Sequence, residues 1–284
     1  MKHHYVPVFL QRAWAGASPD RKVEVFRLDL DGIPSSRRCP KYTGYEEDLW
    51  ALSKDQVAGM SCQALEKLLF SRIDNDAAIV RRKLEEQGLR VLTSDDRENW
   101  ARFLMSLRLR QPDLVRTLKD ESAEQLRTVL GEQPEQYEKL AGCDDPPSLV
   151  EWTEKKYPGL IENFGLSFFA ELGDIPEVGI SLMRMKWWIW DFSATPHDLV
   201  LADNPCIFTS GITDPNLIVA LPISPKKAFL AIQTGRVSES LRRQNRKTLV
   251  QRINESSVLQ ACVRIYARDK SPARFIRNRR FSQG

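Results

Sequence analysis

The chain has 284 residues, of which 42% are hydrophobic and 28% charged, and its formal net charge is only +4. This composition is typical of a globular protein and excludes intrinsic disorder, and the length suffices for one large domain or two small ones. No apolar run approaches the roughly 20 residues of a membrane helix, and the first residues lack the apolar stretch of a secretory signal. We therefore expect a cytoplasmic protein with no membrane partner.

The cysteines favour the same compartment. Five of them stand at positions 39, 62, 143, 206 and 262, and none forms a Cys-x-x-Cys pair. An odd number at wide spacing fits neither a disulfide framework nor a zinc ribbon. We interpret most of them as small buried thiols.

The chain opens on a polar cluster, His3-His4-Tyr5, that holds two of its three histidines. Pro7 follows closely and suits the first turn of a helix, which is predicted over Val8–Trp14. Alternating β-branched and polar residues then predict a strand over Val23–Asp29. Residues 33–61 show no regular pattern and are expected to be irregular.

The next hundred residues are predicted to be helical. Apolar residues spaced three and four apart indicate an amphipathic helix over Ser61–Gln87. The sequence Thr93-Ser94-Asp95-Asp96 is a capping signal for a second helix, which carries apolar residues from Trp100 onward. Two more helices are expected over Leu118–Leu130 and Ser148–Phe169.

From Met183 the pattern changes to strands. The segment Met183–Phe192 places Trp188 and Trp190 on one face of a strand and Trp187 on the other, and burial in a sheet explains all three without a ligand. Downstream we expect one helix, Arg242–Val258, and four strands: Leu199–Ala202, Leu217–Ile223, Ala228–Gln233 and Val263–Ala267.

These elements predict an α+β fold in a single domain spanning residues 1–284. A central, bundle-like helical region is expected to pack on a mixed β-sheet that is built from N- and C-terminal strands. We divide the chain into an N-terminal motif with a strand and an irregular segment (1–60), a helical region (61–175), a β-rich region with one helix (180–270) and a basic tail (271–284).

His4 is the first candidate for chemistry. A histidine can act as a general acid or base near neutral pH, or donate a hydrogen bond to phosphate. Adjacent residues of an extended segment point to opposite sides, so His3 and His4 are not expected to bind one metal ion together. The alternative is a capping or buried histidine that holds the N-terminus in place.

A second candidate is Arg110, which lies with Arg108 in an otherwise apolar helix. At three residues from Leu107 it falls at the edge of the apolar stripe. A partly buried guanidinium requires a carboxylate or phosphate partner. The alternative to a ligand is a structural ion pair with Asp113 or with an acidic residue elsewhere.

The third candidate is the pair Asp203 and Asn204, which follows an apolar strand. Strand ends are places where side chains emerge toward a cleft, and this pair could orient a histidine or hold Mg²⁺ or Mn²⁺. Ordinary turn chemistry before Pro205 is the alternative. Asn254 is a weaker candidate, and His3, Tyr5 and Arg108 would support the cluster.

Charge is unevenly distributed. The segment Glu121–Glu177 holds 13 acidic and 4 basic residues, whereas Arg242–Arg280 holds 12 basic and 2 acidic residues. The basic segment is a candidate footprint for DNA or RNA, although the two segments could instead neutralise each other within the chain. The residues that we expect to contact nucleic acid are Arg242, Arg243, Arg246, Lys247, Arg277, Arg279 and Arg280.

Five landmarks in order resemble an uncharacterised bacterial family, a domain of unknown function, whose members open on His-Tyr-Val-Pro. The resemblance spans nearly the whole chain and implies a single family domain, but it supplies no activity. This sequence has Arg-Gln-Pro and Ala-Asp-Asn-Pro where the family pattern has Arg-Thr-Pro and Ser-Asp-Asn-Pro. The landmarks are His4-Tyr5-Val6-Pro7, Arg110-Gln111-Pro112, Leu201-Ala202-Asp203-Asn204-Pro205, Leu221-Pro222-Ile223-Ser224-Pro225 and Ile253-Asn254.

Histidine, arginine and carboxylate together suit phosphoryl chemistry, and the sequence contains no glycine-rich nucleotide loop and no Gly-x-Ser-x-Gly elbow. Our leading hypothesis is a nuclease, a hydrolase of the antiphage-defence or toxin type. In it His4 is the acid or base, Arg110 neutralises phosphate, and Asp203 with Asn204 orients His4 or holds a metal ion. The alternative is a non-catalytic sensor module that binds a nucleotide, nucleic acid or protein and whose polar cluster is structural.

Overall fold

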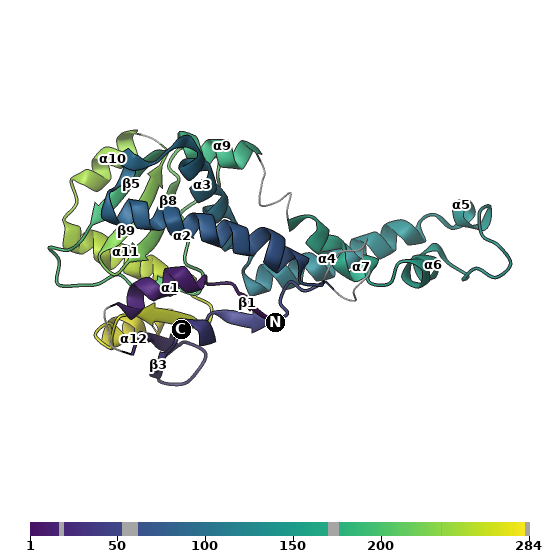
Figure 1. The fold of residues 1–284 in the computed structure, drawn as a ribbon, viewed down its shortest axis with the longest axis horizontal. Helices are drawn as coiled ribbons and strands as arrows, with labels where there is room; N and C mark the ends of the chain where they lie inside the picture. Colours follow the sequence, from purple (N-terminus) through teal and green to yellow (C-terminus); the bar gives the residue numbers. More distant parts are fainter. Residues whose placement is uncertain (17–19, 53–61, 170–175, 234, 282–284) are drawn as a thin grey trace. The chain divides into compact units, whose positions relative to one another are not determined.

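The computed structural model of the chain describes residues 1–16, 20–52, 62–169, 176–233 and 235–281 (Figure 1). The predicted α+β class is confirmed. Within the described residues, no helix combines the length and the apolar character needed to cross a lipid bilayer. The chain divides into two compact units: unit 1 is Met1–His3, Glu46–Arg72 and Leu109–Asp174, and unit 2 is His4–Tyr45, Ile73–Arg108 and Ile175–Gly284.

Unit 2 is built on two four-stranded sheets, and the strand pairings in both are antiparallel. The expected mixed sheet is therefore corrected to two antiparallel ones. The first sheet has the order β3-β2-β10-β6, with strands β2 (Val23–Arg27), β3 (Ser35–Arg38), β6 (Leu201–Ala202) and β10 (Arg264–Ala267). The second has the order β5-β9-β8-β7, with strands β5 (Lys186–Asp191), β7 (Ile207–Phe208), β8 (Ile218–Ser224) and β9 (Lys227–Ile232).

The first sheet joins the two ends of the sequence, as predicted. In the pairing of β2 with β10, Phe26 lies opposite Ile265 and Val25 lies opposite Tyr266. The helices α11 (Arg246–Gln260) and α12 (Ala273–Phe281) add Val258 and Ile276 to the core around Phe26 and Ile265. Burial of these side chains offsets the entropic cost of closing so long a loop.

Helices cover both faces of the second sheet (Figure 1). On one face lie α2 (Ser71–Glu86) and α3 (Ser94–Leu109). There the Trp100 and Phe229 rings pack edge to face with their centroids 5.6 Å apart, and the Arg97 guanidinium lies 3.9 Å from the Trp187 ring centroid. The other face carries Trp188 and Trp190 beside α10 (Gly235–Arg242) and α11. The predicted alternation of the three tryptophans is confirmed.

The predicted cap of α3 is also confirmed. The Thr93 hydroxyl accepts the amide N–H of Asp96 at 3.1 Å, and the Asp96 carboxylate accepts the amide N–H of Thr93 at 2.9 Å. This reciprocal arrangement satisfies two N–H groups that a helix start leaves without partners. Lys83 of α2 donates to the same carboxylate, so the cap also joins the two helices.

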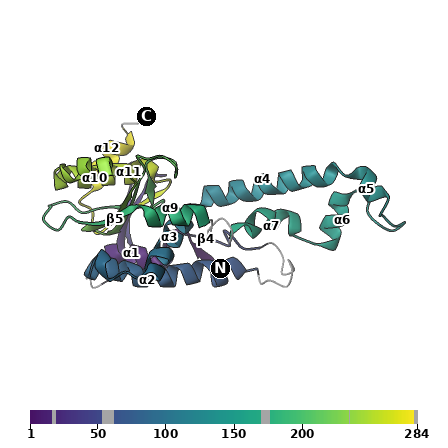
Figure 2. The same ribbon diagram turned by 90° about the horizontal axis from the view of Figure 1, so that it is seen from above.

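Unit 1 is largely helical. Gly165 sets the spacing between α4 and α7, which pack against each other (Figures 1 and 2). A Cβ at Gly165 would lie 2.4 Å from the backbone oxygen of Leu118, which is too close for any side chain. The helices are α4 (Pro112–Gly131), α5 (Pro134–Glu138), α6 (Leu149–Lys156) and α7 (Leu160–Ser167).

Three short elements belong to the N-terminal part of the chain. The strands β1 (Lys2–His4) and β4 (Tyr45–Glu47) form a two-stranded sheet, and α1 (Val8–Ala15) begins directly after Pro7, which caps it. The Gln11 side chain of α1 donates to the carbonyl oxygens of Val6 and Thr43.

Several predicted boundaries are wrong. The segment 33–61, expected to be irregular, contains β3, a 3₁₀ turn at Pro40–Tyr42 and β4, while residues 53–61 lie outside the described ranges. The sequence Ser-Ser-Arg-Arg of β3 has no apolar alternation, because an edge strand is stabilised by the backbone hydrogen bonds of its neighbour. The helix expected from Ser61, itself outside the described residues, consists of a π-helical segment, Leu65–Phe70, followed by α2.

The C-terminal part is more helical than expected. The region 180–270 contains α10 in addition to α11, and α9 (Pro176–Arg184) extends into it. The expected basic tail 271–284 forms α12, apart from residues 282–284, which the structure does not describe. Its sequence lacks an amphipathic stripe, and Ile276 is its buried anchor.

Replacing Gly165 with alanine tests the packing of unit 1. We expect a loss of about 1–3 kcal/mol in the free energy of unfolding, because backbone must move to admit the new methyl group. Gly131→Ala is the matched control, since a Cβ there meets nothing within 4 Å. Thermal or urea denaturation should show a lower stability for the first variant alone; equal stabilities would contradict the close approach.

Candidate functional site

Asp203 holds the turn between β6 and β7. The residue is 2% exposed, and its Oδ1 accepts the amide N–H groups of Cys262 at 2.8 Å and Asn204 at 3.1 Å. Its Oδ2 accepts those of Val263 at 2.7 Å and Arg264 at 2.8 Å. Burial raises the pKa of Asp203, whereas these N–H donors act in the opposite direction. The carboxylate therefore connects the end of β6 to the start of β10.

The N-terminal motif reaches this turn through Tyr5. The guanidinium of Arg264, whose amide N–H donates to Asp203, also donates to the Tyr5 hydroxyl. Tyr5 is only 3% exposed. Tyr5 thus ties the first residues of unit 2 to a residue 259 positions later.

The two histidines have different surroundings, as their adjacent positions predicted. His3 is buried in unit 1, where its Nδ1 accepts the Trp50 amide N–H at 3.2 Å, its Nε2 lies 2.6 Å from Gln63 Oε1, and its ring stacks on Trp50. An accepting Nδ1 makes Nε2 the protonated nitrogen, which donates to Gln63. His4 packs its ring against Tyr45 in unit 2, with the ring centroids 5.5 Å apart.

The two candidate arginines also have separate surroundings. Arg110 is fully buried in unit 1, and its guanidinium carbon lies 4.7 Å from the Phe70 ring centroid. It is therefore more deeply buried than the edge position that we expected. The carboxylate of Asp113, one partner that we considered for it, instead accepts from Arg116 at 3.1 Å. Arg108 lies over the Phe208 ring in unit 2.

Asn254 is structural by its contacts. Its Oδ1 accepts the Val200 amide N–H and its Nδ2 donates to the Asp198 carbonyl oxygen, both at 2.9 Å, so it fixes the segment that enters β6. The backbone oxygen of Asn204 accepts from Gln260. The Asn204 side chain, by contrast, has no hydrogen bond within the described part of the chain. The catalytic roles proposed for His4, Arg110, Asp203 and Asn204 stay predictions.

The basic residues of α12 are used to hold that helix in place. Arg277 Nε donates to the Gly32 carbonyl oxygen, Arg279 pairs with Glu255 at 3.2 Å, and Arg280 donates to the Ala261 carbonyl oxygen. These contacts connect α12 to the β2–β3 turn and to α11. They explain how so charged a segment forms a stable helix.

The basic residues between α10 and α11 lie on aromatic rings instead. The Arg242 guanidinium lies 4.2 Å from the Trp188 ring centroid, and that of Arg246 lies 4.9 Å from the Trp190 ring centroid. Lys186 Nζ lies 5.6 Å from the Trp188 ring centroid. We call this surface the arginine–tryptophan face; it comprises Lys186, Trp188, Trp190, Arg242, Arg243, Arg246 and Lys247, whose cationic side chains are all exposed.

The acidic segment finds ion-pair partners close by in sequence. Arg127 pairs with Glu154 and Glu162, all three in unit 1. The carboxylates that pair with the basic segment, Asp198 with Arg268 and Glu255 with Arg279, lie in unit 2. Among the described residues, mutual neutralisation of the two segments therefore has no ion pair to support it.

The described residues contain no group of three or more histidine, cysteine, aspartate or glutamate side chains that could hold a metal ion. A role for Mg²⁺ or Mn²⁺ stays a prediction. The cysteines carry free thiols, but only Cys206 is buried, so our interpretation of most of them as buried is wrong. Burial raises the pKa of Cys206, which keeps that thiol protonated at neutral pH.

The sequence reasoning missed the aromatic half of the arginine–tryptophan face. Trp190 is buried, as we expected, and Trp188 is half-buried, but the contacts of their rings with Arg242, Arg246 and Lys186 were not expected. A signal was present, because alternation placed both tryptophans on one face of a strand while α11 was predicted to begin with arginines. Which face of the strand α11 would cover could not be read from spacing.

The chain belongs to the DUF4238 family, described as a protein of unknown function, whose family model matches residues 2–271. This match confirms the family-level resemblance seen in the sequence. Neither the curated proteins nor the solved structures contain a match to the chain.

Asp203→Asn tests the structural role of the carboxylate. An amide has one accepting oxygen and presents an NH₂ group to the remaining backbone donors, so at least one buried N–H loses its acceptor. Each such loss costs about 1–3 kcal/mol, and we expect the melting temperature to fall by several degrees. Asn204→Ala, in the same turn, should melt like the wild type. Wild-type stability of the Asp203 variant would contradict the role.

His3 predicts a pH dependence of stability. Burial lowers its pKa below the value of about 6.5 of an exposed histidine, so the folded state favours the neutral ring. Its contribution is present above pH 6.5 and is lost as the pH falls below that value, since only the unfolded chain gains the proton easily. We expect the melting temperature of His3→Gln to fall less between pH 7.5 and 5.5 than that of the wild type or of His197→Gln. An equal fall in melting temperature for His3→Gln and the wild type would contradict this expectation.

Proposed function

We propose that this member of the DUF4238 family binds single-stranded nucleic acid through the arginine–tryptophan face of unit 2. The observation that carries the proposal is the placement of exposed cations on the two tryptophans of β5. Two of them, Arg242 and Arg246, come from one short stretch at the junction of α10 and α11, where Arg243 and Lys247 add two further exposed cations.

The electrostatics of the face favour a polyanion. Among the described residues, Arg242, Arg243, Arg246 and Lys247 have no carboxylate partner within ion-pair distance, in contrast to Arg279 on α12. Asp191, at the end of β5, lies 3.7 Å from Lys227, which reduces its effect on the face. Glu239 is the acidic residue of α10. The cations of the face therefore outnumber its carboxylates, as phosphate binding requires.

The geometry favours single strands. A guanidinium that lies on an indole ring is held in position while the N–H groups at its edge stay able to donate to phosphate oxygens. The outer surface of the same planar group can stack on an unpaired base. Duplex DNA has no exposed base faces, so it should bind only through its phosphates.

The nuclease hypothesis remains a prediction, as do its antiphage-defence and toxin roles. Its weakest part is Asp203, since both carboxylate oxygens already accept backbone N–H groups. The same contacts favour the non-catalytic alternative, in which the polar cluster is structural. Incubating wild type and His4→Ala with DNA and RNA, with Mg²⁺, with Mn²⁺ and without metal, should show no cleavage that depends on His4. Cleavage by the wild type but not by His4→Ala would support the nuclease hypothesis.

Arg242→Ala/Arg246→Ala tests the binding proposal. Fluorescence anisotropy with a labelled single-stranded oligonucleotide, measured at several salt concentrations, should give a salt slope of about −0.7 for each phosphate contact, so the double variant should lose about 1.4 of that slope. The affinity should fall at least tenfold at low salt.

The matched control is Arg82→Ala/Arg90→Ala, which removes the same charge from exposed positions elsewhere in unit 2. Arg242→Lys/Arg246→Lys keeps the charge and should retain the salt slope while binding more weakly, because lysine cannot stack on bases. Equal binding by both alanine double variants, or a preference for duplex, would refute the proposal.

A further inference from the structure

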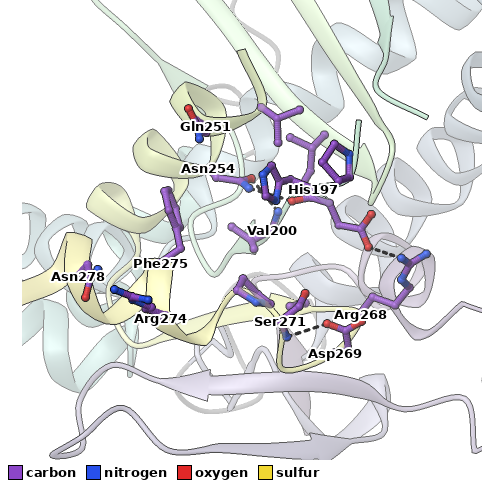
Figure 3. Close-up of a pocket in the computed structure, with 16 residues that line it drawn as sticks. His197, Val200, Gln251, Asn254, Arg268, Asp269, Ser271, Arg274, Phe275 and Asn278 are labelled. Carbon is purple, nitrogen blue, oxygen red and sulfur yellow. Dashed lines mark hydrogen bonds and ion pairs between the residues drawn. The ribbon is translucent and has the colours of Figure 1, made fainter. Parts of the chain in front are cut away.

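A second possible binding site lies in unit 2, within a cavity of about 570 Å³ (Figure 3). Three segments line it: the residues that lead into β6, one side of α11, and the stretch from the end of β10 into α12. Its volume falls within the range of about 300–1,000 Å³ that is typical of small-molecule sites. It shares no residue with the arginine–tryptophan face.

The floor of the cavity is apolar and fixed. Val200, Val250 and Ala267 line it, and each is at most 2% exposed. Asn254 also lines it, but both ends of its carboxamide are used by the backbone of Val200 and Asp198. This hydrogen-bonded frame keeps the cavity open without contributing free polar groups to its base.

The rim carries two carboxylates, Asp198 and Asp269, and two cations, Arg268 and Arg274. Asp198 pairs with Arg268 at 2.6 Å and with Lys226, which is not part of the cavity lining, at 2.8 Å. The carboxylate of Asp269 accepts the Ser271 amide N–H at 2.8 Å, and the side chain and the amide of Ser271 both lower the pKa of Asp269. The charge of Asp198 is thus balanced by ion pairs within the protein, while Asp269 is oriented by its hydrogen bond with Ser271.

Arg274 is the uncommitted cation of the rim. It is exposed in the first turn of α12, and it has no carboxylate partner among the described residues. The first turn of a helix also carries the positive end of its dipole, which adds to the attraction for an anion placed beside Arg274. His197 supplies a further hydrogen-bonding ring at the rim (Figure 3).

An aromatic wall stands next to this cation. Phe275 follows Arg274 and is half-buried, and Figure 3 shows its side chain rising from α12 beside the cavity. With Val200 and Val250 it offers an apolar surface of the kind that receives a flat ring. Gln251 of α11 lies on the same cavity and can hydrogen-bond the edge of such a ring.

We propose that this cavity binds a nucleoside monophosphate. The phosphate pairs with Arg274 at the start of α12, and the base lies against Phe275 and the valines of the floor. Neither a phosphate nor a nucleoside alone would use both features of the cavity. A free phosphate would leave the apolar floor exposed to water, and an uncharged nucleoside would leave Arg274 without an anionic partner. The proposal is independent of nucleic-acid binding at the other face.

Isothermal titration calorimetry of the full chain with AMP, adenosine and inorganic phosphate tests it. AMP should bind at least tenfold more tightly than either of the other two. Arg274→Ala should weaken AMP binding at least tenfold, and Phe275→Leu should weaken it severalfold while leaving the fold intact by thermal denaturation. Arg90→Ala and Arg242→Ala/Arg246→Ala should bind AMP like the wild type.

Three results would overturn the proposal. They are the absence of AMP binding at millimolar concentration, equal binding of AMP and inorganic phosphate, and wild-type affinity in Arg274→Ala. Loss of AMP binding in Arg242→Ala/Arg246→Ala would also overturn it, by assigning the nucleotide to the arginine–tryptophan face.

Discussion

The hydrogen bonds of the buried Asp203 carboxylate are the constraint on which the rest of unit 2 depends. They fix three consecutive amides at the start of β10, and β10 in turn pairs with β2 on one side and β6 on the other. Arg264 extends the same arrangement to Tyr5 and therefore to the N-terminal motif. Asp203 and Arg264 therefore hold together the sheet that joins the two ends of the chain.

The cations of unit 2 fall into two groups, those that are paired within this structure and those that are not. The first group has partners in the protein: Arg264 donates to Tyr5, Arg268 pairs with Asp198, and Arg279 pairs with Glu255. Among the described residues, the cations at the α10–α11 junction and Arg274 have no carboxylate partner. A rigid scaffold with uncommitted cations at its surface is suited to binding anions, because little ordering is needed when the ligand arrives.

Local patterns in the sequence predicted much of this fold. Thr93 and Asp96 form the expected cap, the three tryptophans alternate as expected, and β2 pairs with β10. These features depend on neighbours in sequence or on the burial of apolar strands. By contrast, β3 was missed because its pairing with β2 stabilises it without an apolar pattern, and α12 because tertiary contacts of charged side chains hold it, such as that of Arg277 with Gly32.

The polar residues were harder to interpret. An aspartate at a strand end looks the same in sequence whether it serves a ligand or the backbone, and the partners of Asp203 lie 59 to 61 residues away. The importance of His4 was likewise inferred from its rarity, while its neighbour Tyr5 makes the long-range contact. Residue type indicated where polar interactions would gather, but only the three-dimensional positions show which groups are already satisfied.

Photochemical crosslinking tests the central claim most directly, namely that unit 2 receives nucleic acid on the tryptophans and arginines of one face. A single-stranded oligonucleotide that carries 5-bromouracil would be irradiated with the full chain, and the crosslinked peptides identified by mass spectrometry. The account predicts crosslinks in peptides that contain Trp188, Trp190 or the α10–α11 junction. Crosslinks confined to α4–α7, or a pattern unchanged in the Arg242→Ala/Arg246→Ala variant, would contradict it.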